Sequence, residues 1–206
     1  MVISWYGEGC FKIQSSETVL TSDPFLASTG LSAPRFKSDI VIKTIAPFPP
    51  ISGEEGVFGI GGAGEYNFKD ITIRGFALPN ESTATFVKTL YLVEAEGIML
   101  CFLGHISEAL DPTVLEHIDA VDILFIPGGD KPFIDTKIAA KLVKNLEPKI
   151  VIPSFFKIPG LKRKSDEVKH FLEELNHKSV DPQEKLTIKK KDVQEIKGVR
   201  VIVLKP

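Results

Sequence analysis

The feature that most constrains the fold is a change of hydrophobic pattern after Phe102. Before it, apolar runs of about four to eight residues alternate with glycines and polar turns, which is typical of strands. These predicted strands are Val2–Trp5, Cys10–Gln14, Thr18–Thr21, Ile40–Thr44, Val57–Ile60, Ile71–Leu78, Thr89–Ala95 and Ile98–Phe102. Ile40–Thr44 is rich in β-branched residues, which favours a strand buried on both faces.

Beyond Phe102, apolar residues at helical spacing alternate with further strands. We expect helices that begin at Asp111-Pro112, at Asp135 or Thr136, and at Ser165, because each site offers an N-cap side chain. The predicted strands are Val121–Ile126, Lys149–Pro153, Leu186–Ile188 and Val199–Leu204. Two packed sheets with helices outside would bury all these apolar faces, in one α/β domain over residues 1–206.

Composition excludes several classes of partner. Charged residues make up 25% of the chain and the net charge is -2, which leaves no electrostatic footprint for nucleic acid. Basic clusters at Lys162–Lys164 and Lys189–Lys191 have acidic neighbours, and we interpret both as solvated faces. Two cysteines, no signal peptide and no long apolar run favour a cytoplasmic protein without a membrane segment.

Four short segments, in order, carry a pattern that is specific when taken together. They are Trp5–Phe11 (Trp-Tyr-Gly-Glu-Gly-Cys-Phe), Thr21–Phe25 (Thr-Ser-Asp-Pro-Phe), Gly62–Tyr66 (Gly-Ala-Gly-Glu-Tyr) and Ile150–Pro153. The set resembles the lactonase-like branch of the metallo-β-lactamase superfamily, nearly from end to end. That resemblance implies a four-layer αββα sandwich and hydrolysis with zinc or manganese.

The residues that hold the metals in the family are missing at the matching positions. The family's His-x-His-x-Asp-His loop falls on a stretch whose four ligand positions are Ile45, Pro47, Pro49 and Pro50. Apolar side chains cannot coordinate a metal, so no metal-activated water is expected.

The other ligand positions have also changed. The opening motif's His is Glu8, the mid-chain His near Leu78–Ser82 is absent, and His105 replaces the bridging Asp. The last His falls on Ser154 or Phe155. We therefore predict no catalytic residue of the family type, no metal site and no cofactor.

What remains is a possible vestigial pocket of Glu8, Asp23, Glu65 and His105. One His and three carboxylates would suffice for a new metal site. The stronger expectation is that Glu8 and His105 are solvated or paired with each other, and that Asp23 and Glu65 form hydrogen bonds to turns. The glycine-rich stretch Gly59–Gly64 precedes a strand rather than a helix, so we interpret it as a turn and not as a dinucleotide loop.

Three functional hypotheses follow. The first is a non-catalytic member with a binding, scaffolding or regulatory role, which forms a homo-oligomer or pairs with an active paralogue. The second is a metal-dependent hydrolase with an altered site, using His105 with Glu8, Asp23 or Glu65. The third is a small-molecule binding module. Phe48 and the prolines would either form an exposed apolar patch or close the old cleft.

Overall fold

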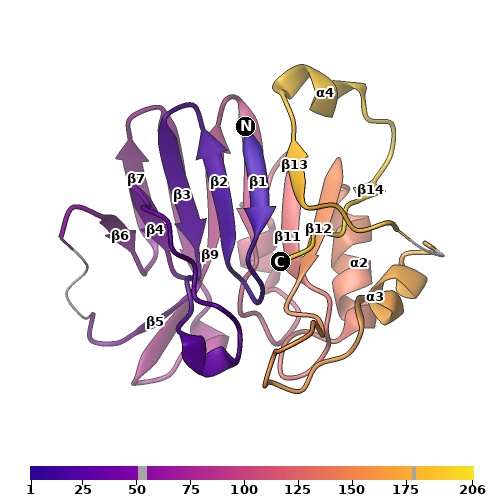
Figure 1. Cartoon of the computed structure of the whole chain (residues 1–206), viewed down its shortest axis with the longest axis horizontal. Helices are drawn as coiled ribbons and strands as arrows, with labels where there is room; N and C mark the ends of the chain where they lie inside the picture. The colour runs from indigo at the N-terminus through magenta and orange to yellow at the C-terminus, as the bar shows by residue number, and fades with distance from the viewer. Residues whose placement is uncertain (51–54, 178–179) are drawn as a thin grey trace.

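The first strands pair as the alternating apolar runs predict. In a computed structural model that describes residues 1–50, 55–177 and 180–206, β1 (Val2–Trp5), β2 (Phe11–Ser15) and β3 (Thr18–Ser22) form an antiparallel meander. The strand β4 (Ile40–Ile42) then pairs with β3 in parallel, and β6 (Phe58–Ile60) pairs with β4 in parallel. The late strand β13 (Lys185–Thr187) pairs with β1, which gives a six-stranded sheet in the order β13-β1-β2-β3-β4-β6 (Figure 1).

The second sheet has eight strands in the order β14-β12-β11-β10-β9-β8-β7 together with β5 on β9. Its antiparallel part is β7 (Gly64–Phe68), β8 (Ile71–Ala77), β9 (Phe86–Ala95) and β10 (Ile98–Phe102). Its parallel part continues through β11 (Ile123–Pro127), β12 (Ile150–Ser154) and β14 (Arg200–Val201). The short strand β5 (Ile45–Pro47) pairs with the beginning of β9.

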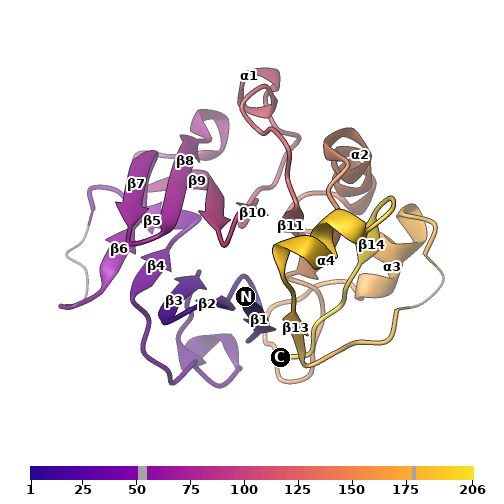
Figure 2. The same ribbon diagram turned by 90° about the horizontal axis from the view of Figure 1, so that it is seen from above.

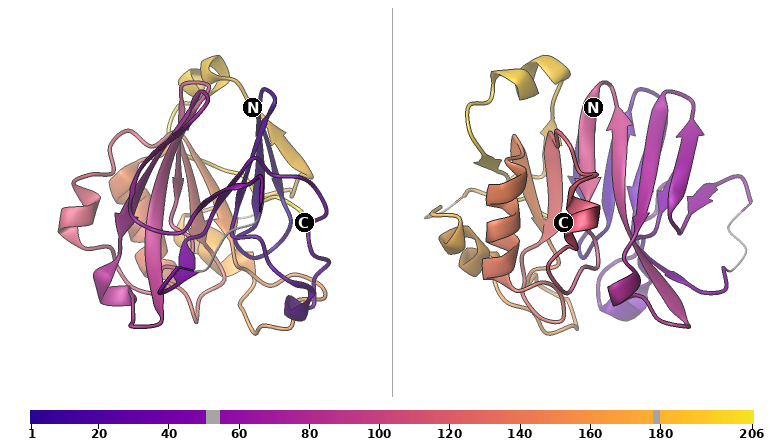
Figure 3. Two further views of the ribbon diagram at one scale, coloured as in Figure 1. Left: turned by 90° about the vertical axis from the view of Figure 1, so that its left-hand side faces the viewer. Right: turned by 180° about the vertical axis from the view of Figure 1, so that it is seen from behind.

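The two sheets lie face to face, with α1 (Pro112–Leu115) and α2 (Thr136–Leu146) on the outer side of the second sheet (Figures 2 and 3). Helix α3 (Val168–Glu174) packs against α2, and α4 (Lys190–Glu195) lies between β13 and β14 in sequence. Two 3-10 turns, η1 (Ala27–Thr29) and η2 (Pro79–Glu81), complete the elements. The predicted α/β sandwich of two sheets is confirmed.

The core lies between the sheets and under α2. Tyr91, Phe11, Phe102 and Phe125 are all almost fully buried there, and Phe102 stacks on Phe125 with ring centroids 4.3 Å apart. In the part of the chain that the structure describes, no helix is long and apolar enough to cross a bilayer.

Several predicted boundaries were wrong. The third helix begins after Glu167 rather than at Ser165, whose hydroxyl does not cap it. The sequence Lys190–Glu195 forms a helix that its charged pattern did not reveal. The stretch interpreted as a turn ends in a strand, β7, because Gly64–Phe68 finds hydrogen-bonding partners on β8, a tertiary contact that local pattern cannot show.

Strand direction determines where polar residues meet. Because β3 and β4 are parallel, and β10, β11 and β12 are parallel, their carboxyl ends share one end of each sheet. In open sheets with parallel strands, ligands bind beyond the carboxyl ends. We therefore expect a binding site beside the residues that follow β3, β4, β10 and β12.

Candidate functional site

A cleft of about 590 Å³ opens beyond these strand ends. Asp23 follows β3, Lys43 follows β4, His105 follows β10 and Phe155 follows β12, and all four line the cleft. The remaining wall comes from the loop after β1, the segment from β3 to η1, the strand β5, and the loops before α2 and α3. Its residues are Glu8, Gly9, Pro24, Phe25, Ser28, Thr29, Ile45, Pro47, Phe133, Leu161, Lys162 and Arg163.

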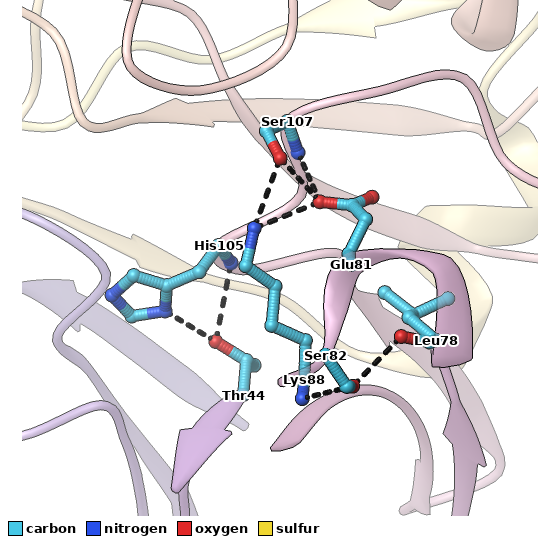
Figure 4. A network of polar contacts seen from close by, with 7 residues as sticks. All are labelled: Thr44, Leu78, Glu81, Ser82, Lys88, His105 and Ser107. Carbon is cyan, nitrogen blue, oxygen red and sulfur yellow. Dashed lines mark hydrogen bonds and ion pairs between the residues drawn. The ribbon is translucent and has the colours of Figure 1, made fainter. Parts of the chain in front are cut away.

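Thr44 connects two of the predicted pocket residues. Its hydroxyl donates to Asp23 Oδ2 at 2.7 Å, and its backbone N–H donates to Asp23 Oδ1 at 2.7 Å. The same hydroxyl lies 2.7 Å from His105 Nδ1, and the His105 backbone N–H also donates to it, at 3.3 Å (Figure 4). Thr44 is buried, so this bridge between the two sheets is shielded from water.

Burial raises the pKa of the Asp23 carboxyl, while His105 and the two hydrogen bonds from Thr44 act in the opposite direction. His105 Nδ1 lies 3.7 Å from Asp23 Oδ2, so the imidazole and the carboxyl are neighbours without a short direct contact. Thr44, which directly precedes the stretch that matches the family's metal-binding loop, thus serves as a hydrogen-bonding relay.

Glu8 forms an ion pair with Arg163, not with His105 as the sequence suggested. Arg163 Nε lies 3.2 and 3.3 Å from the two Glu8 oxygens, and Nη2 lies 2.9 Å from Oε2. Nη2 also donates to the Phe155 carbonyl at 2.7 Å, and the guanidinium lies over the Phe133 ring. The Glu8 and Arg163 side chains are only 11% and 23% exposed. This bidentate geometry is the strong form of a charge-assisted pair.

Phe155 lies at the cleft wall and is almost fully buried. It lies at the position of the family's last His, and its ring meets the His105 ring edge-on, with centroids 4.9 Å apart, and that of Phe133 at 4.2 Å. A Cβ added at Gly9 would come within 2.6 Å of Phe155 Cζ, so the aromatic ring packs directly on the opening motif. Ser154, the alternative position for that His, is buried at the end of β12 and does not line the cleft.

The predicted pocket is brought together in part. Glu8, Asp23 and His105 line one cleft, whereas Glu65 is exposed on β7, opposite Arg74, and is not part of the wall. Including Glu65 was wrong, because the Gly-Ala-Gly-Glu-Tyr segment continues as an edge strand instead of turning toward the cleft. Among the apolar ligand positions, Ile45 and Pro47 line the cleft, while Pro49 and Pro50 are exposed beyond β5.

The cleft stays open, and Phe48 does not fill it. Phe48 is 53% exposed and lies outside the cleft wall. Of the two outcomes considered for the apolar loop, an exposed patch is the one found for Phe48.

A second network supports the His105 loop. Lys88 Nζ contacts Glu81 Oε2 at 2.8 Å and Ser107 Oγ at 3.0 Å, and the Ser107 N–H and hydroxyl both donate to Glu81 (Figure 4). Burial acts to raise the pKa of Glu81, but the hydrogen bonds from Lys88 and Ser107 outweigh it and hold that pKa below its usual range. The hydrogen bonds of Glu81 and Lys88 thus hold Ser107, two residues beyond His105, in place.

Sequence reasoning missed these supporting residues. Thr44, Lys88 and Arg163 belong to no short motif, and their partners are distant in sequence. The basic cluster at Lys162–Lys164 was the available signal, and interpreting all of it as a solvated face was wrong, since Arg163 is largely buried and Lys162 lines the cleft.

The residues present do not fit the family's metals. A zinc site needs three or four donors around one point. Across residues 1–50, 55–177 and 180–206, no group of three or more His, Cys, Asp or Glu side chains could hold an ion. The Glu8 oxygens accept from Arg163 and those of Asp23 accept from Thr44, so each of these oxygens already has a hydrogen-bond partner.

Comparison with known proteins agrees with the fold. Residues 2–154 match the beta-lactamase superfamily domain. The chain has no significant match among curated proteins.

Among solved structures, a candidate Zn-dependent hydrolase of the metallo-β-lactamase superfamily from Thermotoga maritima is similar over 98% of this chain and 97% of its own, with 25% identity and a TM-score of 0.79. The metallo hydrolase Igni18 from Ignicoccus hospitalis is similar over 98% and 94%, with 15% identity and a TM-score of 0.63. The metallo-β-lactamase fold protein YhfI from Bacillus subtilis is similar over 98% of this chain and 95% of its own, with 11% identity and a TM-score of 0.59.

Proposed function

Since the chain belongs to the beta-lactamase superfamily, we propose that it is a metal-independent member whose active-site cleft binds a small molecule without hydrolysing it. The observation that carries this proposal is an open cleft whose carboxylates already have hydrogen-bond partners within the protein. The cleft has a volume within the range of small-molecule sites, roughly 300–1,000 Å³. The carboxylates of Glu8 and Asp23, however, already accept hydrogen bonds from Arg163 and Thr44, respectively.

Apolar replacements at the old metal positions support the same role. Ile45 and Pro47 give the cleft apolar surface at positions where the family has ligands, and such surface contributes to affinity through burial. A binding protein needs this surface together with a few placed polar groups, which Lys43, His105 and Lys162 supply.

The first test is metal content. Protein purified without chelators should contain far less than one equivalent of zinc, manganese, iron or nickel by elemental mass spectrometry. One equivalent or more of one metal, lost on His105→Ala, would overturn the proposal.

The second test is ligand binding with a blocked cleft. Ser28 is exposed on the cleft wall, so Ser28→Trp should fill the cleft without disturbing the core. Thr72 is exposed on β8, outside the cleft wall, and Thr72→Trp is the matched control. In a thermal-shift screen of small metabolites, we expect compounds that stabilise wild type and Thr72→Trp but not Ser28→Trp. A screen in which every stabilising compound acts equally on Ser28→Trp would contradict the binding role.

A second candidate function is supported by the relay of Asp23, Thr44 and His105. An imidazole held by a buried hydroxyl and a carboxyl is a potential general base, which would make the protein a hydrolase of altered chemistry. His105→Ala distinguishes the two, because a hydrolytic activity found by substrate screening would disappear in this variant. Activity that survives the substitution would eliminate His105 as the base.

A further inference from the structure

The cleft has a net positive charge in its wall. Its wall holds three cations, Lys43, Lys162 and Arg163, and two carboxylates, Glu8 and Asp23. Arg163 is paired with Glu8, and the Asp23 oxygens accept from Thr44. Within residues 1–50, 55–177 and 180–206, neither Lys43 nor Lys162 forms an ion pair.

The two lysines come from different walls of the cleft. Lys43 follows β4 of the six-stranded sheet, and Lys162 belongs to the loop before α3, where its N–H donates to the carbonyl of Thr29 in η1. Two ammonium groups that line one cleft attract an anion, and a cleft with low-dielectric walls strengthens that attraction.

The Thr44 hydroxyl determines which nitrogen of the neutral His105 ring carries the proton. The hydroxyl has one proton, and it donates this proton to Asp23. Toward His105 it can therefore only accept, so Nδ1 is the protonated nitrogen at the 2.7 Å contact. The other nitrogen, Nε2, is then an acceptor, and Figure 4 shows it pointing away from Thr44 and from the Lys88 network.

An apolar, aromatic surface lies beside this acceptor. The rings of Phe133 and Phe155 are packed together and both meet the His105 ring edge-on. Such a surface suits a flat or apolar ligand body rather than a heavily hydrated one.

We propose, on the premise that the cleft is a binding site, that its ligand is a small organic anion with a hydroxyl group and an apolar body. Lys43 and Lys162 bind the anionic group, His105 Nε2 accepts from the hydroxyl, and Phe133, which packs on the buried ring of Phe155, contacts the body. The two lysines can bind either a carboxylate or a phosphate. The proposed ligand class is therefore a hydroxylated anion, and the kind of anionic group is left open.

Three probes of similar shape separate these contributions by titration calorimetry. Mandelate has the carboxylate, the hydroxyl and the ring; mandelamide lacks the charge, and phenylacetate lacks the hydroxyl. We expect mandelate to bind at least tenfold more tightly than mandelamide and several-fold more tightly than phenylacetate. Adding inorganic phosphate should compete with mandelate, because both require the lysines.

Variants assign the two preferences to residues. Lys43→Gln with Lys162→Gln should abolish the preference for mandelate over mandelamide, whereas the control pair Lys137→Gln with Lys141→Gln, which removes equal charge from exposed positions on α2, should keep it. His105→Ala should abolish only the preference for mandelate over phenylacetate.

These outcomes separate a failure of the proposed ligand class from a failure of the premise that the cleft is a binding site. Equal affinities for mandelate and mandelamide, or a charge preference that survives in the Lys43 and Lys162 double variant, would overturn the anion assignment but leave the cleft as a binding site. Failure of mandelate to bind at all would overturn the ligand class. The premise itself fails only if the Ser28→Trp screen finds no compound that depends on an open cleft.

Discussion

The ion pair between Glu8 and Arg163 should be a major contributor to the stability of the cleft. Breaking a fully buried pair costs about 3–5 kcal/mol, whereas an exposed pair contributes about 0.2–1 kcal/mol. Here the side chains are 11% and 23% exposed and share three contacts of 2.9 to 3.3 Å. We therefore expect a coupling energy near 2 kcal/mol, between the two limits.

The assay is a double-mutant cycle of Glu8→Gln and Arg163→Met, with the free energy of unfolding measured in urea. Arg163→Met alone should cost about 3 kcal/mol, because it leaves the Glu8 carboxylate unpaired and removes the donor to the Phe155 carbonyl. For a chain of this size that loss corresponds to a melting temperature lower by about 6–12 °C.

The control is the exposed pair Lys169 and Glu173 on α3, whose atoms are 3.6 Å apart and whose side chains are 68% and 55% exposed. Its coupling should stay below about 0.5 kcal/mol. If the Glu8–Arg163 cycle gave an equally small value, the argument that Arg163 holds the cleft wall together would be refuted.

Three further predictions follow from single sites. Gly104→Ala should destabilise the protein by about 2 kcal/mol or more in urea, because Gly104 has a φ of 56° and an added Cβ would overlap Thr44; a loss of less than half that value would contradict the tight contact. Burial raises the pKa of Cys10 to about 12 and that of Cys101 still further, so neither thiol should react with a disulfide reagent at pH 8 until the protein is unfolded; rapid labelling of the native protein would disprove this burial. Burial also raises the pKa of Asp23, so the folded state binds that proton more tightly than the unfolded chain, and the stabilisation is complete below the unfolded pKa of about 3.9 and lost as the pH rises through the folded pKa. In chemical denaturation, wild type should therefore lose stability relative to Asp23→Asn as the pH rises above about 4, and the opposite trend would show that the hydrogen bonds from Thr44 outweigh burial.

The sequence by itself predicted two packed sheets and showed that the residues at the family's ligand positions cannot bind a metal. Strand periodicity is local, so Val2–Trp5 and Ile98–Phe102 were predicted with their observed bounds. The side chain at a given position is also fixed without folding: Ile45 and Pro47 offer no donor to a metal in any conformation. The N-cap Asp111 was predicted, and Asp135 was one of two candidates for the next N-cap, because capping depends on the residue and its next two or three neighbours.

Only the tertiary structure decided which polar groups meet. Arg163 pairs with Glu8 across 155 positions, and Thr44 reaches His105 across 61, distances over which no local pattern carries information. Glu65 stands in a segment that resembles the family as clearly as the others do, yet pairing with β8 keeps it on an edge strand. Whether the apolar loop would close the cleft or leave it open depended on how β5 pairs with β9, because that pairing sets the direction in which Phe48 leaves the sheet.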